Sequence, residues 1–79
     1  MVTDMNRDSV EMALAQAERH VARGEVILAH QRARVAASER SGHNVARFKE
    51  LLTVFEDSQR LLVADRDRLR QDPQSASVI

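Results

Sequence analysis

Apolar residues recur along most of this chain at alternating intervals of four and three residues. That spacing places them on one side of an α-helix, and two such runs follow one another, from residue 10 to 38 and from 45 to 69. A seam with this repeat packs against another helix as in a coiled coil. The seam positions are Val10, Leu14, Ala17, Val21, Gly24, Leu28, Gln31, Val35 and Ser38, then Val45, Phe48, Leu52, Phe55, Gln59, Leu62, Arg66 and Leu69.

The rare glycines and the single proline mark the ends of the two helices. Gly42 suits the left-handed position just after a helix, and Asn44 suits the N-cap of the next one. DSVE at 8–11 has the form of a capping box, and Pro73 ends the second helix. The pattern predicts a helix over 9–41, a turn at 42–44 and a helix over 45–71, with residues 1–8 and 73–79 as mobile ends. Because so short a turn makes the helices antiparallel, the predicted fold is an all-α helical hairpin forming one domain over 9–72.

Gly24 lies inside the first predicted helix, where a glycine costs about 1 kcal/mol relative to alanine. We expect that a close contact with the second helix compensates for this cost. A kink in the first helix is the alternative explanation.

The large apolar residues cover a wider arc than one neighbouring helix can bury. Two helices alone would leave four apolar side chains partly in water, and such an exposed patch marks a protein contact. The pattern therefore predicts self-association, with two hairpins forming a four-helix bundle and a two-fold dimer as the favoured form. The residues assigned to this interface are Ile27, Leu51, Val54 and Leu61.

One polar layer is expected within the seam if residues equidistant from the turn face each other. His20 would then lie near Asp65 and Arg66, and Gln31 near Val54 or Phe55. A histidine beside a carboxylate could form a proton-responsive or ligand-binding site. The alternative, which we prefer, is a structural layer that fixes the register of the helices at a cost in stability.

Composition argues against catalysis and against a bound metal or cofactor. Cysteine is absent, and the three histidines at 20, 30 and 43 are neither close together nor on one helix face. The acidic groups at 56–57 and 65–68 have basic residues three or four places away, as on a solvated helix surface. The chain contains no glycine-rich phosphate loop and no hydroxyl paired with a base. No apolar run is long enough for a membrane span, and the chain start does not have the form of a signal peptide, so we expect a cytoplasmic, non-catalytic protein.

Nucleic-acid binding and a heteromeric bundle are the two alternatives to self-association. Twelve Lys and Arg balance twelve Asp and Glu, so the whole molecule has no strong attraction for polyanions. The arginines of the first helix alternate with glutamates, and no Trp or Tyr is present to stack on bases. The same apolar arc could instead complete a bundle with a different helical protein. The arginines concerned are Arg19, Arg23, Arg32, Arg34 and Arg40.

Three segments of the chain resemble a group of short uncharacterised helical-hairpin proteins abundant in soil alphaproteobacteria of the rhizobial type. They are AERHVARGE at 17–25, ERSGHN at 39–44 and LLTVFEDSQRLLVADRDRL at 51–69. The similarity covers about residues 10–70 and lies in the order of helix, GH turn and helix. It implies a bacterial, cytoplasmic helical hairpin, and it assigns no site residues.

Overall fold

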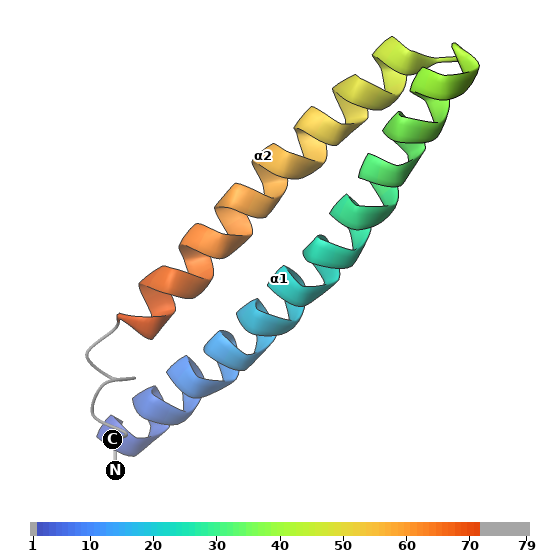
Figure 1. Ribbon diagram of the computed structural model, residues 1–79. Helices are drawn as coiled ribbons and strands as arrows, with labels where there is room; N and C mark the ends of the chain where they lie inside the picture. The colour runs from blue at the N-terminus through green and yellow to red at the C-terminus, as the bar shows by residue number, and fades with distance from the viewer. Residues whose placement is uncertain (1, 72–79) are drawn as a thin grey trace.

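Two antiparallel helices joined at one end make up the computed structural model, which describes residues 2–71, with side chains from Arg7 onward (Figure 1). Helix α1 spans Val2–Ser41 and helix α2 spans Val45–Arg70. The two helices pack side by side, and no strand occurs between residues 2 and 71. The predicted all-α hairpin is therefore confirmed. The predicted tail at 73–79 lies outside the described residues.

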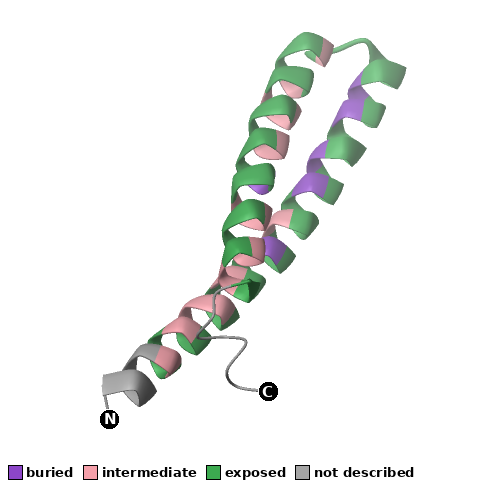
Figure 2. Cartoon of the chain, turned by 90° about the vertical axis from the view of Figure 1, so that its left-hand side faces the viewer, coloured by how far each residue is buried: buried purple, intermediate pink, exposed green. Residues whose placement is uncertain are grey.

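Helix α1 is longer than the pattern predicts, because it begins at Val2 and not at Ser9. No glycine or proline interrupts residues 2–8, and each further residue added to an existing helix gains a hydrogen bond that offsets the entropy lost in fixing its backbone. Asp8 and Glu11 therefore lie inside the helix and do not form a capping box at its start. With 40 residues against 26 in α2, α1 extends beyond the end of its partner (Figure 2).

The turn depends on two residues with left-handed backbone conformations. Gly42 has a φ of 76°, as predicted, and its amide donates to the carbonyl of Ser38 at 2.7 Å, which closes the end of α1. Asn44 is the N-cap of α2, also as predicted, but its side chain makes no capping hydrogen bond. Its φ of 57° gives the reason for an asparagine here, since Asn tolerates this conformation better than most residues.

The core of the hairpin is the predicted seam. Every seam position is buried or half-buried, and the fully buried residues lie where the two helices face each other (Figure 2). The buried apolar side chains are Val21, Leu28 and Val35, all on α1. Three polar seam residues are buried with them: Gln31, Ser38 and Gln59.

Each buried polar side chain donates to a backbone carbonyl, as most groups removed from water do, whereas the buried Oε1 of Gln59 accepts no hydrogen bond within the described chain. Gln31 reaches across the seam, and its Nε2 donates to the carbonyl of Phe48 at 3.0 Å. Ser38 bonds within its own helix, to the carbonyl of Val35 at 2.8 Å. Gln31 thus links the two helices on the turn side of the hairpin.

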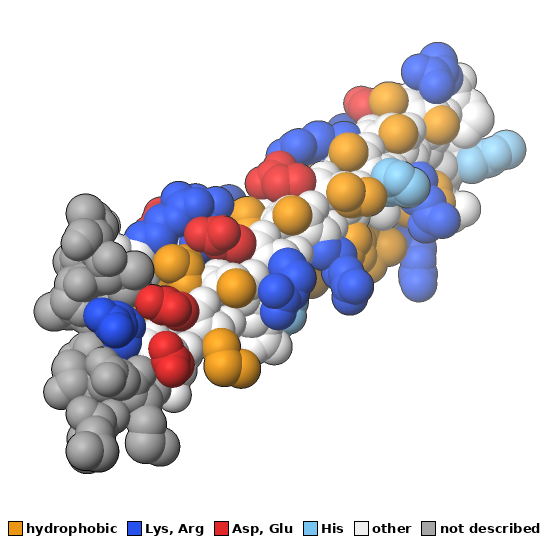
Figure 3. All heavy atoms as spheres, turned by 90° about the horizontal axis from the view of Figure 1, so that it is seen from below, with side chains coloured by type: hydrophobic (Ala, Val, Ile, Leu, Met, Phe, Trp, Pro, Cys, Tyr) orange, Lys and Arg blue, Asp and Glu red, His pale blue; other side chains and the backbone are white. Residues whose placement is uncertain are grey.

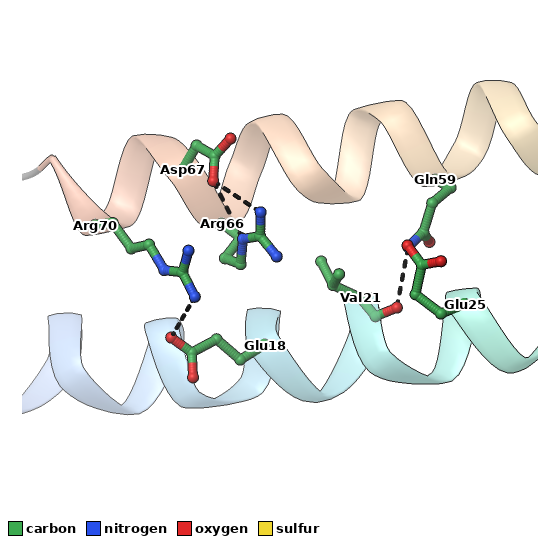
Figure 4. Close-up of polar contacts among 7 residues, drawn as sticks. All are labelled: Glu18, Val21, Glu25, Gln59, Arg66, Asp67 and Arg70. Carbon is green, nitrogen blue, oxygen red and sulfur yellow. Dashed lines mark hydrogen bonds and ion pairs between the residues drawn. The ribbon is translucent and has the colours of Figure 1, made fainter.

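Gln59 of α2 packs closely against Gly24 of α1. The amide nitrogen of Gln59 donates to the carbonyl of Val21 at 3.0 Å and to Oε1 of Glu25 at 2.9 Å (Figure 4). Its amide oxygen occupies the space of a side chain at position 24, since a Cβ there would lie 1.8 Å from it. This contact confirms the predicted reason for a glycine inside α1.

The first prediction is that Gly24→Ala destabilises the protein, although alanine is the better helix former by about 1 kcal/mol. The new methyl group displaces the Gln59 amide and breaks its two hydrogen bonds, at a cost of about 1–3 kcal/mol. Urea denaturation measures the change in the free energy of unfolding.

Gln59→Ala provides the control, because it empties the space that the methyl group needs. In this background Gly24→Ala should raise the free energy of unfolding by about 1 kcal/mol, the ordinary gain in helix propensity. The same sign in both backgrounds would show that the contact with Gln59 is not the reason for Gly24.

Candidate interaction surface

The two long sides of the hairpin carry different chemistry. On one of them, three ion pairs connect the helices, and all six side chains are exposed enough that each pair contributes no more than about 1 kcal/mol. We call this the bridged side. Its ion pairs join Glu18 to Arg70 at 3.4 Å, Arg32 to Glu56 at 3.8 Å and Glu39 to Lys49 at 3.6 Å (the first is drawn in Figure 4).

Charged side chains also surround the shallow groove on the bridged side. Leu28, Gln59 and Val63 line this groove together with Arg32 and Glu56, which form one of the bridging pairs. A helix docking here would have to remove these ionised groups from water, which is costly. The bridged side is therefore poorly suited to bury apolar surface.

The opposite side carries no ion pair between the helices among residues 7–71, and we call it the unbridged side. Three large apolar residues are exposed here: Ile27 at 42%, Val54 at 56% and Leu61 at 69%. Leu51, the fourth residue of the predicted interface, is half-buried. The structure therefore leaves the predicted interface residues at least partly uncovered.

These residues belong to a second stripe on each helix, about 100° around from the seam at 3.6 residues per turn. Each stripe repeats the three-and-four spacing of the seam. We call them the α1 side stripe and the α2 side stripe. The α1 side stripe is His20, Arg23, Ile27, His30 and Arg34, and the α2 side stripe is Arg47, Leu51, Val54, Ser58, Leu61, Asp65 and Arg68.

Shallow grooves run along the unbridged side between the helices. One is lined by Ile27, His30 and Arg34 of α1 with Phe55 of α2. A second lies nearer the open end and includes His20 and Asp65. The grooves bring the two side stripes to a common surface, on which another helix can lie.

The predicted polar layer is not part of the hairpin core. His20 and Asp65 are exposed on the edges of one groove, and only Arg66 sits in the seam, with 22% of its side chain exposed. Each of the other two residues immediately precedes a seam residue and is thus rotated about 100° out of the seam. Gln31, Ser38 and Gln59 are the buried polar side chains of the described core.

The partners of these residues also differ from the prediction. Asp65 pairs with Arg68 one turn along α2, and Arg66 donates to Asp67 at 3.0 Å (Figure 4). Residues at equal distances from the turn do lie side by side along the hairpin. This count does not show in which direction each side chain points around its helix, so it did not identify the polar residues of the core.

Sequence reasoning missed the asymmetry between the two sides, although a signal for it is present. In the first helix, positions 18, 25, 32 and 39 are spaced by seven and hold Glu, Glu, Arg and Glu. In the second helix, positions 49, 56 and 70 are separated by multiples of seven and hold Lys, Glu and Arg. Residues seven apart lie on one side of a helix, next to the seam. Opposite charges at these flanking positions indicate the bridged side.

The described residues contain no group of three or more His, Asp or Glu side chains able to hold a metal ion. Neither helix, over its described length, is long and apolar enough to cross a membrane. Comparisons with protein-family models, with curated proteins and with solved structures found no match.

The second prediction follows from the position of His20 on the surface. In the single hairpin, at protein concentrations too low for association, His20→Leu should change the free energy of unfolding by less than about 0.5 kcal/mol, because exposed substitutions away from caps and networks have small effects. Thermal or urea denaturation measures this change. A loss or gain above 1 kcal/mol would mean that His20 takes part in a buried layer after all.

Proposed function

We propose that this protein is a non-catalytic interaction module, a helical hairpin that associates with a second copy of itself through its unbridged side. The observation that carries the proposal is the exposure of Ile27, Val54 and Leu61 on the one side that lacks bridging ion pairs. Exposed apolar patches on small helical proteins mark surfaces that bind other proteins. The expected product is a four-helix bundle made of two hairpins.

The energetics of the single hairpin favour association. Only three apolar side chains are buried among the described residues, and no side chain there is less than 2% exposed. A chain of 79 residues without cysteine has no disulfide to compensate for so small a core. A second hairpin would bury more of the apolar surface that the single hairpin leaves exposed.

The unbridged side offers that contact without removing an interhelical ion pair from water. A fully buried Val, Leu or Ile side chain contributes roughly 1.5–3 kcal/mol, and two-fold symmetry uses each one twice. Association costs about 4–15 kcal/mol in lost freedom of motion, so several such residues must be buried together. The side stripes provide Ile27, Val54 and Leu61 from each copy, together with the exposed part of the half-buried Leu51.

The third prediction is that the wild-type protein has twice the monomer mass at micromolar concentration, and that Val54→Asp combined with Leu61→Asp halves it. The two carboxylates would enter an apolar interface without partners, at a cost of several kcal/mol. Light scattering and sedimentation measure the mass, and circular dichroism measures the helix content.

The matched control is Thr53→Asp combined with Ala64→Asp, which adds the same two charges to the same helix. Both positions are exposed and each immediately precedes an α2 side stripe residue, so they point about 100° away from that stripe. This control variant should remain a dimer. Equal masses for the two double variants would contradict the proposed surface. A fully helical wild-type monomer would contradict self-association and would favour a different helical protein as the partner.

Nucleic-acid binding is the second candidate, favoured by arginines of α1 that are not used within the hairpin. Arg19, Arg23 and Arg34 have no ion-pair partner in the described part of the chain, and Figure 3 shows arginines and histidines along one side of a line of apolar side chains on the outer surface of α1. Such a row could contact phosphates.

The fourth prediction distinguishes this candidate from protein association. Titration into labelled RNA and duplex DNA at 50 mM salt should show no binding at micromolar protein, because the net charge of the chain is zero. Binding that weakens steeply between 50 and 200 mM salt would show counterion release and would support the nucleic-acid candidate.

A further inference from the structure

Arginines frame the exposed apolar residues of the unbridged side. Each side stripe has one arginine nearer the turn than its apolar residues and one nearer the open end of the hairpin. They are Arg34 and Arg23 on α1, and Arg47 and Arg68 on α2. Because the helices are antiparallel, each end of the surface has one arginine from each helix. The apolar centre between these arginines consists of Ile27, Leu51, Val54 and Leu61.

The hairpin offers these arginines a single carboxylate. Asp65 is the one acidic residue of the two side stripes, and it forms an ion pair with Arg68. Arg23, Arg34 and Arg47 are exposed and have no ion-pair partner among residues 7–71. Four arginines against one carboxylate leave three positive charges in excess on the side stripes, before any protonation of the two histidines there.

A second copy of the hairpin does not supply the missing carboxylates. With the turns of two copies at the same end, Arg34 and Arg47 meet the same two residues of the other copy. With the turns at opposite ends, they meet Arg23 and Arg68, and the one carboxylate there, Asp65, already has its partner. Arginines approach arginines in both arrangements, so apolar burial drives the proposed dimer against an electrostatic cost. A partner with carboxylates at these places matches the surface better.

We propose that the unbridged side also binds an acidic amphipathic helix of a different protein, in competition with a second copy of this chain. The partner helix lies along the grooves between α1 and α2, as amphipathic helices do in apolar grooves, and completes a three-helix bundle. It has apolar side chains in its middle and carboxylates near both of its ends. This inference uses the surface proposed for self-association but does not require that two copies associate.

The grooves of the unbridged side have the lining that such a helix needs. Ile27 and the half-buried Phe55 line one groove together with Arg34. Arg34 also lines the groove nearer the turn, where the half-buried Phe48 is exposed to the partner. Arg68 stands at the edge of the groove nearer the open end. Apolar contact is thus available along the grooves, and a guanidinium is available at each end.

The spacing of the arginines sets the spacing of the partner's acidic groups. Arg23 and Arg34 are eleven residues apart on α1, and Arg47 and Arg68 are twenty-one residues apart on α2. At 1.5 Å per residue these separations are about 17 and 32 Å, or about three to six helical turns. A guanidinium can pair with a carboxylate through two parallel hydrogen bonds, while its aliphatic stem covers neighbouring apolar surface.

A helix matches this surface better than a nucleic acid does. Phosphates would pair with the arginines but would leave Ile27, Val54 and Leu61 without apolar contact. Both phenylalanines are half-buried in the seam, and the chain has no Trp or Tyr on which bases could stack. Binding of any polyanion is therefore the competing outcome that an experiment must distinguish.

The fifth prediction concerns a synthetic helical peptide of about 24 residues, with leucines on one face in its middle and glutamates near both ends of that face. The wild-type protein should bind it at least about tenfold more tightly than the same peptide with lysine in place of glutamate, because only the first neutralises the arginines. Fluorescence anisotropy of the labelled peptide measures the dissociation constant. Sedimentation should show that the bound acidic peptide displaces the second copy.

Salt and a scrambled peptide provide the first controls. The affinity for the acidic peptide should fall as salt rises from about 50 to about 500 mM, whereas the homodimer should not weaken, because screening reduces attraction in the first case and repulsion in the second. A peptide of the same composition, with its leucines distributed around the helix, should bind at least about tenfold more weakly than the amphipathic peptide.

Variants of the protein test the role of the arginines. Arg23→Glu combined with Arg34→Glu should reverse the preference, so that the lysine peptide binds more tightly than the acidic one. A gain of binding cannot result from loss of folding, and circular dichroism measures the helix content. Arg19→Glu combined with Arg40→Glu makes the same change in net charge at exposed positions of α1 outside the side stripes. This control should keep the dissociation constant of the acidic peptide within about threefold of wild type.

The outcomes separate this inference from the self-association. Preference for the acidic amphipathic peptide, reversed by the variant at 23 and 34 alone, supports the inference. Equal binding of the scrambled peptide, or equal effects of the two double variants, overturns it and shows general attraction for polyanions. A dimer that binds neither peptide overturns it and leaves self-association standing. A wild-type monomer that binds the acidic peptide supports it and overturns self-association.

Discussion

Two helices in contact can cover only one strip of each other's surface, and the rest of this structure depends on that limit. Each step along a helix turns the side chain by about 100°, so a residue next to a seam position points away from the partner helix. Val21 is buried in the seam, whereas its neighbour His20 is exposed. The α1 and α2 side stripes lie one such step from the seam, where nothing in the hairpin can cover them.

The register of the seam is fixed by polar side chains more than by apolar ones. Apolar residues at three-and-four spacing pack almost equally well if one helix slides by a turn. Gln59 does not tolerate such a slide, because its amide needs the carbonyl of Val21 and the space left by Gly24. Gln31 requires the carbonyl of Phe48 in the same alignment. The bridging ion pairs on the surface then follow from a register that the core has already determined.

The sequence predicted those features that depend on one helix at a time. The seam, the left-handed Gly42 and the partly exposed Ile27, Val54 and Leu61 follow from periodicity and from local backbone preference. The start of α1 did not follow, because a capping motif competes with continued helix growth and the sequence alone does not decide between them.

Features that depend on both helices together were harder to predict. The glycine at 24 indicated a close contact, but its partner, Gln59, depends on the axial alignment of α2 to within a fraction of a turn. His20 and Asp65 do share a groove, as their equal distance from the turn suggests, yet rotation about each helix axis places them outside the core. The position of a residue along the hairpin can be predicted by counting from the turn. The direction of its side chain around the helix axis must be considered separately for each residue.

The ion pairs of the bridged side contribute to specificity more than to stability. Exposed pairs are worth little to folding, but a helix that docked over them would have to remove their charges from water. They therefore disfavour association on that side, while the unbridged side leaves Val54 and Leu61 uncovered. A hairpin with two equally apolar sides would stack without limit, since each added copy would expose a new surface for the next. In the proposed self-association, one charged side and one partly apolar side would allow a single partner, so the same asymmetry that selects the surface would also close the assembly.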